Sequence, residues 1–226
     1  MSKIIQIAGF DHIQYHPQFP TEQELYERSA DFFQMMDQRR SVREFSDKPV
    51  PMEVIQNIIK TASTAPSGAH KQPWQFCVIQ NPSIKRDIRT AAEAEEKEAY
   101  GSRMSEQWKK DLLPLATTWE KPFLEIAPYL IIVFKKAYED LENPKETNYY
   151  VNESTGIACG MLISAIHQAG LVTLTHTPQP MKFLHKILNR PKNEKPFLLL
   201  PVGYPADEVF VPHIHRKSLD KVMEVY

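Results

Sequence analysis

The chain has 226 residues, with 27 basic and 28 acidic side chains and a formal net charge of −1 at pH 7. This length predicts one domain or two closely packed ones, and the charge balance argues against a nucleic-acid-binding surface, which needs a basic surplus. There are 7 glycines against 18 prolines, and neither G-x-G-x-x-G nor G-x-x-x-x-G-K-[ST] occurs. The usual signatures of dinucleotide-binding and P-loop proteins are therefore absent.

The N-terminal part of the chain predicts an arm followed by two helices. Residues 1–20 are expected to form an irregular arm, because the segment contains two prolines and shows no hydrophobic period. Thr21 and Glu24 match a capping box, which predicts a helix that runs to about Gln38. Apolar residues at helical spacing predict a second helix, with Pro51 at its first position.

The rest of the chain predicts strands and helices in mixed order. We expect a strand at 74–80, a long polar helix at 83–112 with Ser83 as its cap, a strand at 129–135, an apolar helix at 154–169, a strand at 171–175, a short helix at 181–188 and a strand at 196–204. The run at 129–135 is continuously apolar, which is typical of a strand covered on both faces. The pattern predicts an α+β domain of three layers with a central sheet.

The two cysteines, Cys77 and Cys159, are too few for a disulfide framework and lack a C-x-x-C partner. We expect both to be buried thiols. No apolar stretch reaches the roughly 18 residues of a spanning helix, and the first ten residues are too weakly patterned for a secretory signal. These features predict a cytoplasmic protein with no membrane partner.

The first candidate site consists of Arg39, Arg40, Ser41 and Arg43. Guanidinium groups are planar and permanently charged, so they suit bidentate binding of a phosphate, and a serine hydroxyl adds a neutral donor. The alternative is a group of solvated basic residues that stabilise the end of the preceding helix.

The second candidate is the small-residue loop Ala65-Pro66-Ser67-Gly68-Ala69-His70. Such a loop lets backbone N–H groups approach a flat ligand closely, although the same residues also simply make turns.

The third candidate is Glu96 and Tyr100, one helical turn apart, together with Lys121. A carboxylate, a phenol and an ammonium group could together bind a zwitterionic amino acid. The alternative is a solvated face, because residues 93–98 form a charge run.

The remaining polar residues are less informative. His213 and His215 lack a convincing third ligand, so no metal site is expected. Thr173, Thr175 and Thr177 alternate as strand residues do, and their hydroxyls could reach a ligand, but threonine is also a good strand former.

Taken in order, these segments resemble the nitroreductase-type flavoprotein superfamily. RRSVREFSDKPVPMEVI (39–55) and TAPSGAHKQPWQF (64–76) carry that broad resemblance. EEKEAY (95–100), the W-x-K at 119–121, GIACGMLISAIHQAGLVTLTHTP (156–178) and LLLPVGYP (198–205) resemble the iodotyrosine deiodinase family within it. The resemblance covers roughly residues 35–220.

The resemblance implies a nitroreductase-like α+β fold with a central mixed sheet flanked by helices, in an intertwined homodimer with FMN at the subunit interface. It implies a single FMN-binding domain over 1–226, with an active-site lid at about 90–121. The implied FMN-binding residues are Arg39, Arg40, Ser41, Val42, Arg43, Pro66, Ser67, Gly68, Thr175, His176, Thr177 and Arg216. The segment that matches 175–177 commonly has three threonines, so His176 is a mild departure, which should matter little if its side chain points away from the flavin ring.

The activity implied is reductive dehalogenation of halotyrosines, 3-iodo-L-tyrosine giving L-tyrosine and iodide, by stepwise electron transfer. Thr177, with its hydroxyl near flavin N5, and Ala69, whose N–H would donate to the substrate phenolate, are the implied catalytic residues. Glu96, Tyr100 and Lys121 would bind the substrate's ammonium and carboxylate groups. An unidentified reductase or NAD(P)H would supply electrons.

Two alternatives stay open. A broad-specificity FMN nitroreductase or quinone reductase would transfer hydride to nitroaromatics without needing the lid. A non-catalytic flavin-binding or amino-acid-binding protein would bind these ligands without releasing halide.

Overall fold

The structure, a computed structural model, describes residues 2–139, 142 and 146–226. The chain forms two compact units, Met1–Gln38 and Arg39–Tyr226. The boundary between the two units follows Gln38, where the first predicted helix ends.

The N-terminal unit contains a β-hairpin that the sequence analysis did not predict. β1 (Ile4–Ile7) pairs antiparallel with β2 (Phe10–Ile13). The two residues between the strands, Ala8 and Gly9, have φ values of +51° and +84°. Two positive φ values are what a tight two-residue hairpin requires, because that turn matches the twist of the strands. The expected irregular arm at 1–20 is therefore wrong for residues 4–13.

The unit continues into α1 (Glu22–Asp37), whose predicted capping box is confirmed. The Glu24 N–H donates to Thr21 Oγ1 at 3.3 Å, and the Thr21 N–H donates to Glu24 Oε2 at 2.7 Å. None of the residues of α1 is buried, and the side chains of Phe32 and Phe33 are 59% and 65% exposed.

The second unit is built on a four-stranded sheet. In sheet order, its strands are β3 (Trp74–Ile79), β4 (Tyr129–Lys136), β6 (Glu194–Gly203) and β5 (Val172–Thr173). Neighbouring strands pair antiparallel, and a parallel bridge between Ser41 and Thr173 adds the start of the unit to the β5 edge. This arrangement confirms the expected α+β class with a mixed sheet.

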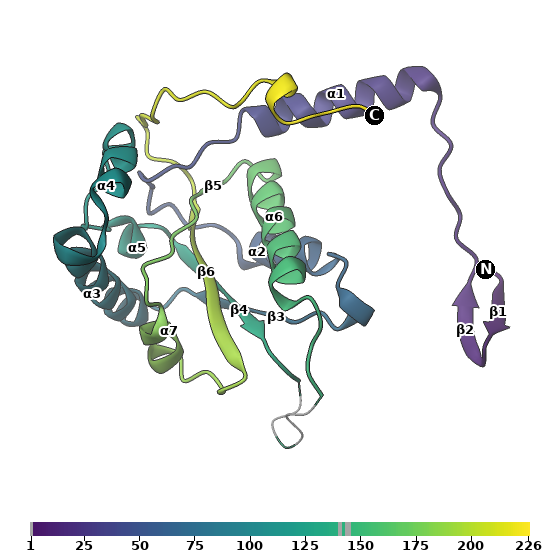
Figure 1. The fold of residues 1–226 in the computed structure, drawn as a ribbon, viewed down its shortest axis with the longest axis horizontal. Coiled ribbons are helices and arrows are strands. Elements are labelled where there is room, and N and C mark those ends of the chain that lie inside the picture. The colour runs from purple at the N-terminus through teal and green to yellow at the C-terminus, as the bar shows by residue number, and fades with distance from the viewer. Residues whose placement is uncertain (1, 140–141, 143–145) are drawn as a thin grey trace. The chain divides into compact units, whose positions relative to one another are not determined.

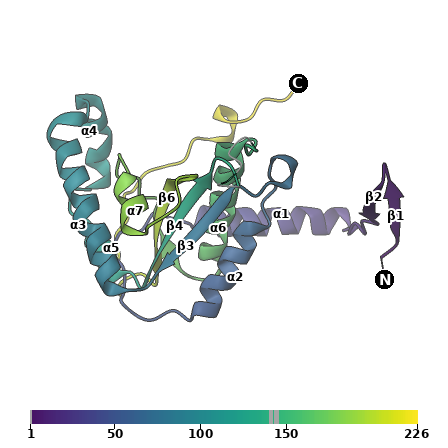
Figure 2. The same ribbon diagram turned by 90° about the horizontal axis from the view of Figure 1, so that it is seen from below.

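Helices cover both faces of this sheet, as Figures 1 and 2 show. In chain order they are α2 (Met52–Ser63), α3 (Pro82–Glu98), α5 (Phe123–Ile126), α6 (Val151–Gln168) and α7 (Lys182–Ile187). Ile131 and Val133 of β4 pack in one core with α2 and α6. Ile132 and Phe134 pack in the other core with α3, α5 and α7. Alternate residues of one strand thus serve two cores, which confirms the three predicted layers.

The long helix predicted at 83–112 is interrupted. α3 ends at Glu98, a π-helical turn follows at Ala99–Arg103, and α4 (Glu106–Leu112) begins after an extended Met104. Ser105 caps α4 by accepting from the N–H of Trp108 at 3.1 Å. The serine offers a competing helix start, which the prediction of a continuous helix overlooked.

Other boundaries differ slightly from those expected. Asn81, not Ser83, caps α3, because its Oδ1 accepts from two backbone N–H groups of the first turn. Pro51 is the N-cap of α2 rather than its first residue. Single 3₁₀ turns occur at Leu113–Leu115 and Leu219–Lys221. Among the described residues, no helix is long and apolar enough to cross a membrane.

Both cysteines are free thiols, as predicted. Cys159 on α6 is buried, and burial raises its pKa to about 12. Cys77 on β3 is half-buried, and burial raises the pKa of this thiol too.

Candidate functional site

The segment that carries the predicted arginine cluster is attached to the sheet by its backbone. The Val42 N–H donates to the Thr173 carbonyl at 3.2 Å, and the Val42 side chain is buried. In extended backbone the neighbouring side chains project to the opposite side, so Ser41 and Arg43 face away from the core. Val42 therefore fixes the direction of its two polar neighbours.

Three arginines come together at this segment. Arg216 Nη2 donates to the Arg39 carbonyl at 3.1 Å, and the Arg40 guanidinium donates to the Pro212 carbonyl. The pKa of Arg39 is lowered, first by burial and then by the positive charges of Arg216 and Arg40. A multiply charged anion with several acceptor oxygens would relieve this repulsion, so the cluster fits a phosphate group.

The loop after α2 exposes Ala69, one of the predicted site residues. Gly68–His70 form a single 3₁₀ turn, in which Ala69 has a φ of +49° and is exposed. The hydrogen bonds of this turn are donated by the N–H groups of His70 and Lys71, at 3.0 Å each. The Ala69 N–H lies outside this pattern, as a donor to a ligand would.

Gly68 lets this loop approach the start of α6 closely. A Cβ atom on Gly68 would lie 2.8 Å from Cδ2 of Tyr150 and 3.2 Å from the carbonyl oxygen of Tyr149. The loop is thus positioned by two tyrosines that were not among the predicted site residues. Their only signal in the sequence is an aromatic pair just before an apolar helix.

Successive side chains of the segment at 175–177 point to opposite sides of the backbone. Its centre is fixed by a pair of hydrogen bonds, His176 N–H to the Leu199 carbonyl at 2.9 Å and the reverse at 3.1 Å. His176 is buried, whereas Thr175 and Thr177 are exposed. The histidine therefore points to the opposite side from the two threonines.

The His176 side chain lies in an apolar and positively charged environment. Its ring packs edge-on against Phe123, with the ring centroids 5.7 Å apart. Within the described part of the chain, its buried Nε2 has no hydrogen-bond partner. Burial, followed by the positive charges of Lys121 and Arg43, lowers the pKa of His176 to about 3. The imidazole is therefore neutral at physiological pH.

The structure brings the three predicted clamp residues, Glu96, Tyr100 and Lys121, together. Lys121 Nζ lies 3.5 Å from Glu96 Oε2 and 5.8 Å from the centre of the Tyr100 ring. The Lys121 side chain is only 4% exposed, and that of Glu96 is 14% exposed. The Tyr100 hydroxyl donates to the Thr117 carbonyl at 3.2 Å.

A network of ion pairs connects the clamp to α3. The Lys121 N–H donates to Glu93 Oε1 at 2.7 Å, and Arg89 pairs with the same carboxylate at 2.7 Å. Arg89 also pairs with Glu125 of α5 at 3.2 Å. Tyr100 itself lies in the π-helical turn, a rare geometry that is frequent at functional sites.

The opposite charges of Lys121 and Glu96 only partly offset the effect of burial on the pKa of each residue. Burial lowers the pKa of Lys121, and the Glu96 carboxylate opposes that shift. Burial raises the pKa of Glu96, and Lys121 opposes it. The positive charge of Arg43 further lowers the pKa of Lys121. Burial raises the pKa of Tyr100, and Arg43 opposes that rise. Arg43 therefore links the arginine segment to the clamp electrostatically, a relation that spacing in the sequence did not reveal.

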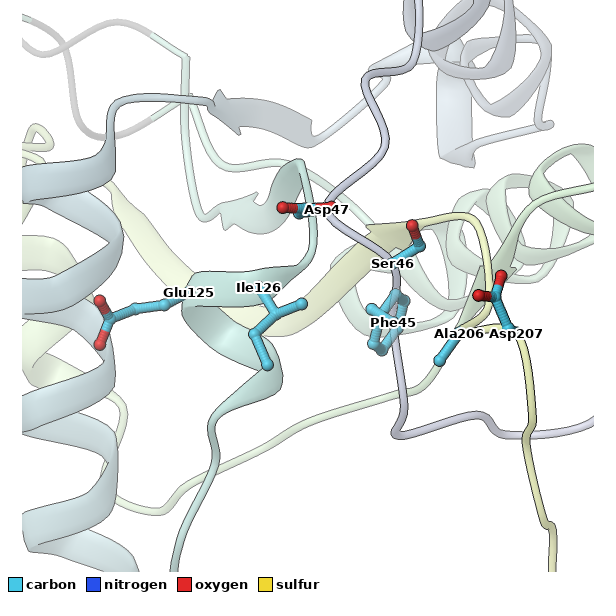
Figure 3. A pocket seen from close by; sticks show the side chains of 7 residues that line it. All are labelled: Phe45, Ser46, Asp47, Glu125, Ile126, Ala206 and Asp207. Atoms are coloured by element: carbon cyan, nitrogen blue, oxygen red, sulfur yellow. The ribbon is translucent and has the colours of Figure 1, made fainter.

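A separate pocket of about 520 Å³ is shown in Figure 3. Its walls are formed by Phe45, Ser46, Asp47, Glu125, Ile126, Ala206 and Asp207, none of which was a predicted site residue. The carboxylates of Asp47, Glu125 and Asp207 point in different directions (Figure 3). Among the described residues, no group of three or more His, Cys, Asp or Glu side chains could hold a metal ion.

The fold and this geometry agree with known proteins. The model of the nitroreductase family matches residues 36–204. A protein named iodotyrosine deiodinase from Haliscomenobacter hydrossis is 62% identical over 210 residues, covering 92% of this chain and 94% of that protein. Iodotyrosine deiodinase 1 of Homo sapiens is 47% identical over 216 residues, covering 94% of this chain and 74% of that protein.

The fold is also similar to that of a solved structure. The crystal structure of an oxidized iodotyrosine deiodinase bound to FMN and 3-iodo-L-tyrosine superposes with a TM-score of 0.75 at 31% identity, covering 83% of this chain and 96% of that chain. The fold and the site thus define a nitroreductase-like oxidoreductase. The chain belongs to the nitroreductase family and, within it, to the iodotyrosine deiodinases.

Proposed function

We propose that this protein is an FMN-dependent reductive dehalogenase that converts 3-iodo-L-tyrosine and related halotyrosines to tyrosine and halide. The observation that carries the proposal is the clamp, in which Glu96, Tyr100 and Lys121 converge although Lys121 lies far from the other two in the sequence. A carboxylate and an ammonium group beside each other match the two charges of a free amino acid.

FMN is held in this proposal by residues whose geometry suits it. Arg39, Arg40 and Arg216 bind the phosphate, whose negative charge offsets both the burial and the repulsion that lower the pKa of Arg39. Ser41, the Val42 backbone and Arg43 complete that end. Pro66, Ser67, Gly68, Thr175, His176 and Thr177 line the rest, His176 through its backbone because its side chain is turned inward. When bound, the flavin supplies the two electrons that the reaction consumes.

The substrate is oriented at both ends by this chain. The N–H of Ala69, which is not used in the 3₁₀ turn, donates to the phenol oxygen and stabilises its anion. At the other end, the Lys121 ammonium binds the substrate carboxylate, and the Glu96 carboxylate binds the substrate ammonium. The substrate therefore replaces the internal ion pair with two new ones.

The hydroxyl of Thr177 is the second catalytic group. Thr177 is exposed beside the buried His176, so its hydroxyl can donate to flavin N5. A donor there favours transfer of single electrons over hydride transfer. The residues at about 90–121 act as a lid that excludes water and completes the site only when the correct amino acid is bound.

We also propose that the enzyme is a homodimer with FMN at the subunit interface. Supporting this, α1 has no buried residue and exposes Phe32 and Phe33, whereas helices gain most of their stability from packing. A reductase or NAD(P)H supplies electrons. The two free thiols suit a reducing compartment, in keeping with a cytoplasmic location.

The decisive experiment tests cofactor and reaction separately. The purified protein should be yellow, or become so on adding FMN, and after anaerobic reduction with dithionite it should release iodide from 3-iodo-L-tyrosine. A protein that binds FMN but turns over only a nitrophenol would instead be a nitroreductase. A protein that binds FMN and iodotyrosine without releasing iodide would be a binding protein.

A further inference from the structure

Four exposed lysines lie close together along the chain in the second unit, and three of them line one pocket. Lys182 and Lys186 lie on α7, and Lys192 and Lys195 lie before and within the first part of β6. α7 and β6 lie beside each other (Figure 1). We call these four residues the lysine patch.

The lysine patch is a concentrated positive charge in a nearly neutral chain. Residues 182–195 contain five basic residues and a single acidic one, Glu194, while the whole chain has a net charge of −1. Glu194 is buried and is neutralised by Arg190, whose guanidinium contacts both carboxylate oxygens at 2.7 and 2.8 Å. Among the described residues, the lysines of the patch form no ion pair. Their charge is therefore available to a partner.

Three of these lysines line a pocket of about 540 Å³. The pocket is formed by Gln179, Pro180, Met181, Lys182, His185, Lys192, Glu194, Lys195 and Pro196. Pro180, Met181 and Pro196 give it an apolar part, and exposed lysines border it. An apolar centre with a polar, accessible border is the usual anatomy of a protein-binding surface.

The pocket is close along the chain to the reacting end of the proposed flavin site. Gln179 in its wall is two residues from Thr177, so their Cα atoms are at most about 7 Å apart. Electrons that arrive at this pocket would therefore have a short path to the group that Thr177 contacts.

We propose that the lysine patch is the docking surface of an acidic electron-carrier protein. This inference rests on the proposed function, which needs a reductant. For each substrate molecule the carbon–halogen bond breaks, the halide leaves with the bonding pair, and a proton is added at the carbon. Two electrons balance this reaction, and two reduced carriers, each of which gives up one, supply them to the flavin.

The exposure of the lysines favours a protein over other anions. A phosphate site is usually built from preorganised donors, such as an arginine fork or a helix N-terminus, and the four lysines are instead exposed. A membrane surface would engage protruding apolar side chains, and Met181 is recessed at 6% exposure. Mobile lysines around a shallow apolar centre suit brief, salt-sensitive docking, as transient electron-transfer encounters require.

The test uses the FMN-loaded protein with two acidic probes, a plant-type [2Fe–2S] ferredoxin and a flavodoxin. Binding is measured by calorimetry at 20 and 300 mM NaCl, and flavin reduction by the reduced probe is followed in a stopped-flow spectrometer. The test variant is K182E/K195E, which reverses two pocket lysines. Its matched control is K48E/K60E, which makes the same charge change at two exposed lysines, one of them on α2 on the opposite face of the sheet.

We expect at least one probe to bind the unmodified protein, with affinity falling at least tenfold at the higher salt. K182E/K195E should lose at least tenfold in affinity and in reduction rate, and K48E/K60E less than twofold. Dithionite-driven iodide release should stay unchanged in both variants, because dithionite needs no docking.

Several results would overturn the proposal. The first is that neither probe binds. The second is that the two variants lose equal affinity for a probe. The third is that phosphatidylserine vesicles or NADPH bind in place of the probes and that this binding depends on Lys182 and Lys195. If the unmodified protein fails to release iodide with dithionite, the proposed function fails, whereas the calorimetry still reports on docking.

Discussion

The arginine cluster and the clamp handle charge in opposite ways. In the clamp, Lys121 and Glu96 are buried together and neutralise each other at 3.5 Å. At the cluster, burial and then the like charges of Arg216 and Arg40 lower the pKa of Arg39. A ligand at the cluster relieves repulsion, whereas a ligand at the clamp must compete with an existing ion pair. The first arrangement suits a resident cofactor, and the second suits a substrate that exchanges at every turnover.

The largest effect is expected from removing two of the like charges that distinguish the cluster from the clamp. R39A/R40A should weaken FMN binding at least a hundredfold, because a hydrogen bond to a charged group contributes about 1.5–3 kcal/mol and two arginines are lost. Quenching of FMN fluorescence on titration measures this. Arg86→Ala, which removes an arginine exposed at 69%, is the control and should bind FMN normally. Unchanged binding by the double variant would show that the cluster is not the phosphate site.

A second test concerns His176, whose pKa is lowered first by burial and then by the positive charges of Lys121 in the clamp and Arg43 beside the cluster. Its pKa falls from 6.5 to about 3 on folding, so the unfolded chain binds more protons between these values. The free energy of unfolding should therefore decrease as the pH falls from about 6.5 to about 3, by at most about 5 kcal/mol from this group. His176→Phe should remove that part of the slope in urea titrations at each pH. His16→Phe, at an exposed position, should keep it.

The clamp itself is tested by Lys121→Ala, where we expect the affinity for 3-iodo-L-tyrosine to fall about a hundredfold, or about 3 kcal/mol. The affinity for FMN should change less than twofold, since Lys121 does not belong to the cluster. Both are measured on one sample by flavin fluorescence. If the variant lost equal affinity for 3-iodo-L-tyrosine and for FMN, the clamp and the cluster would not be separate binding sites. Lys121→Met, which keeps most of the side-chain volume, then shows whether the loss of volume is responsible.

The smallest effect is expected at the loop that carries Ala69. Gly68→Ala should lower stability by about 1 kcal/mol, because its Cβ would crowd Tyr150 at 2.8 Å and the Tyr149 carbonyl at 3.2 Å. Gly156→Ala is the matched control: its Cβ meets open space within α6, so it should stabilise by up to about 1 kcal/mol. Thermal unfolding measures both. A stabilised Gly68→Ala variant would mean that the loop does not depend on this close approach.

The sequence predicted those features that depend on local chemistry. The capping box at Thr21 and the apolar run at 129–135 are local patterns, and both elements form where expected. The hairpin at 4–13 was missed because its signal is one Ala-Gly pair, and the break after Glu98 was missed because Ser105 looked like one more residue in a polar helix.

The site shows more clearly that local sequence patterns do not predict contacts between distant residues. Glu96 and Tyr100 could be paired by helical spacing. Lys121 was added to them for the charge of its ammonium group, and the family resemblance supported that choice, because no local pattern connects residues so far apart in the sequence. The influence of Arg43 on the clamp and the contact of the loop with Tyr149 and Tyr150 arise from tertiary packing. Such relations have no signature in a single sequence.

The π-helical turn at Ala99–Arg103 has an evolutionary consequence. The hydrogen bonds of a π-helical turn reach one residue further along the chain than those of an α-helix, so the residues of this turn leave the register of α3. Gain or loss of a single codon here would re-aim Tyr100 without disturbing the face of α3 that packs on the sheet. The position of Tyr100 is thus one small mutational step from change, on a scaffold that need not change with it.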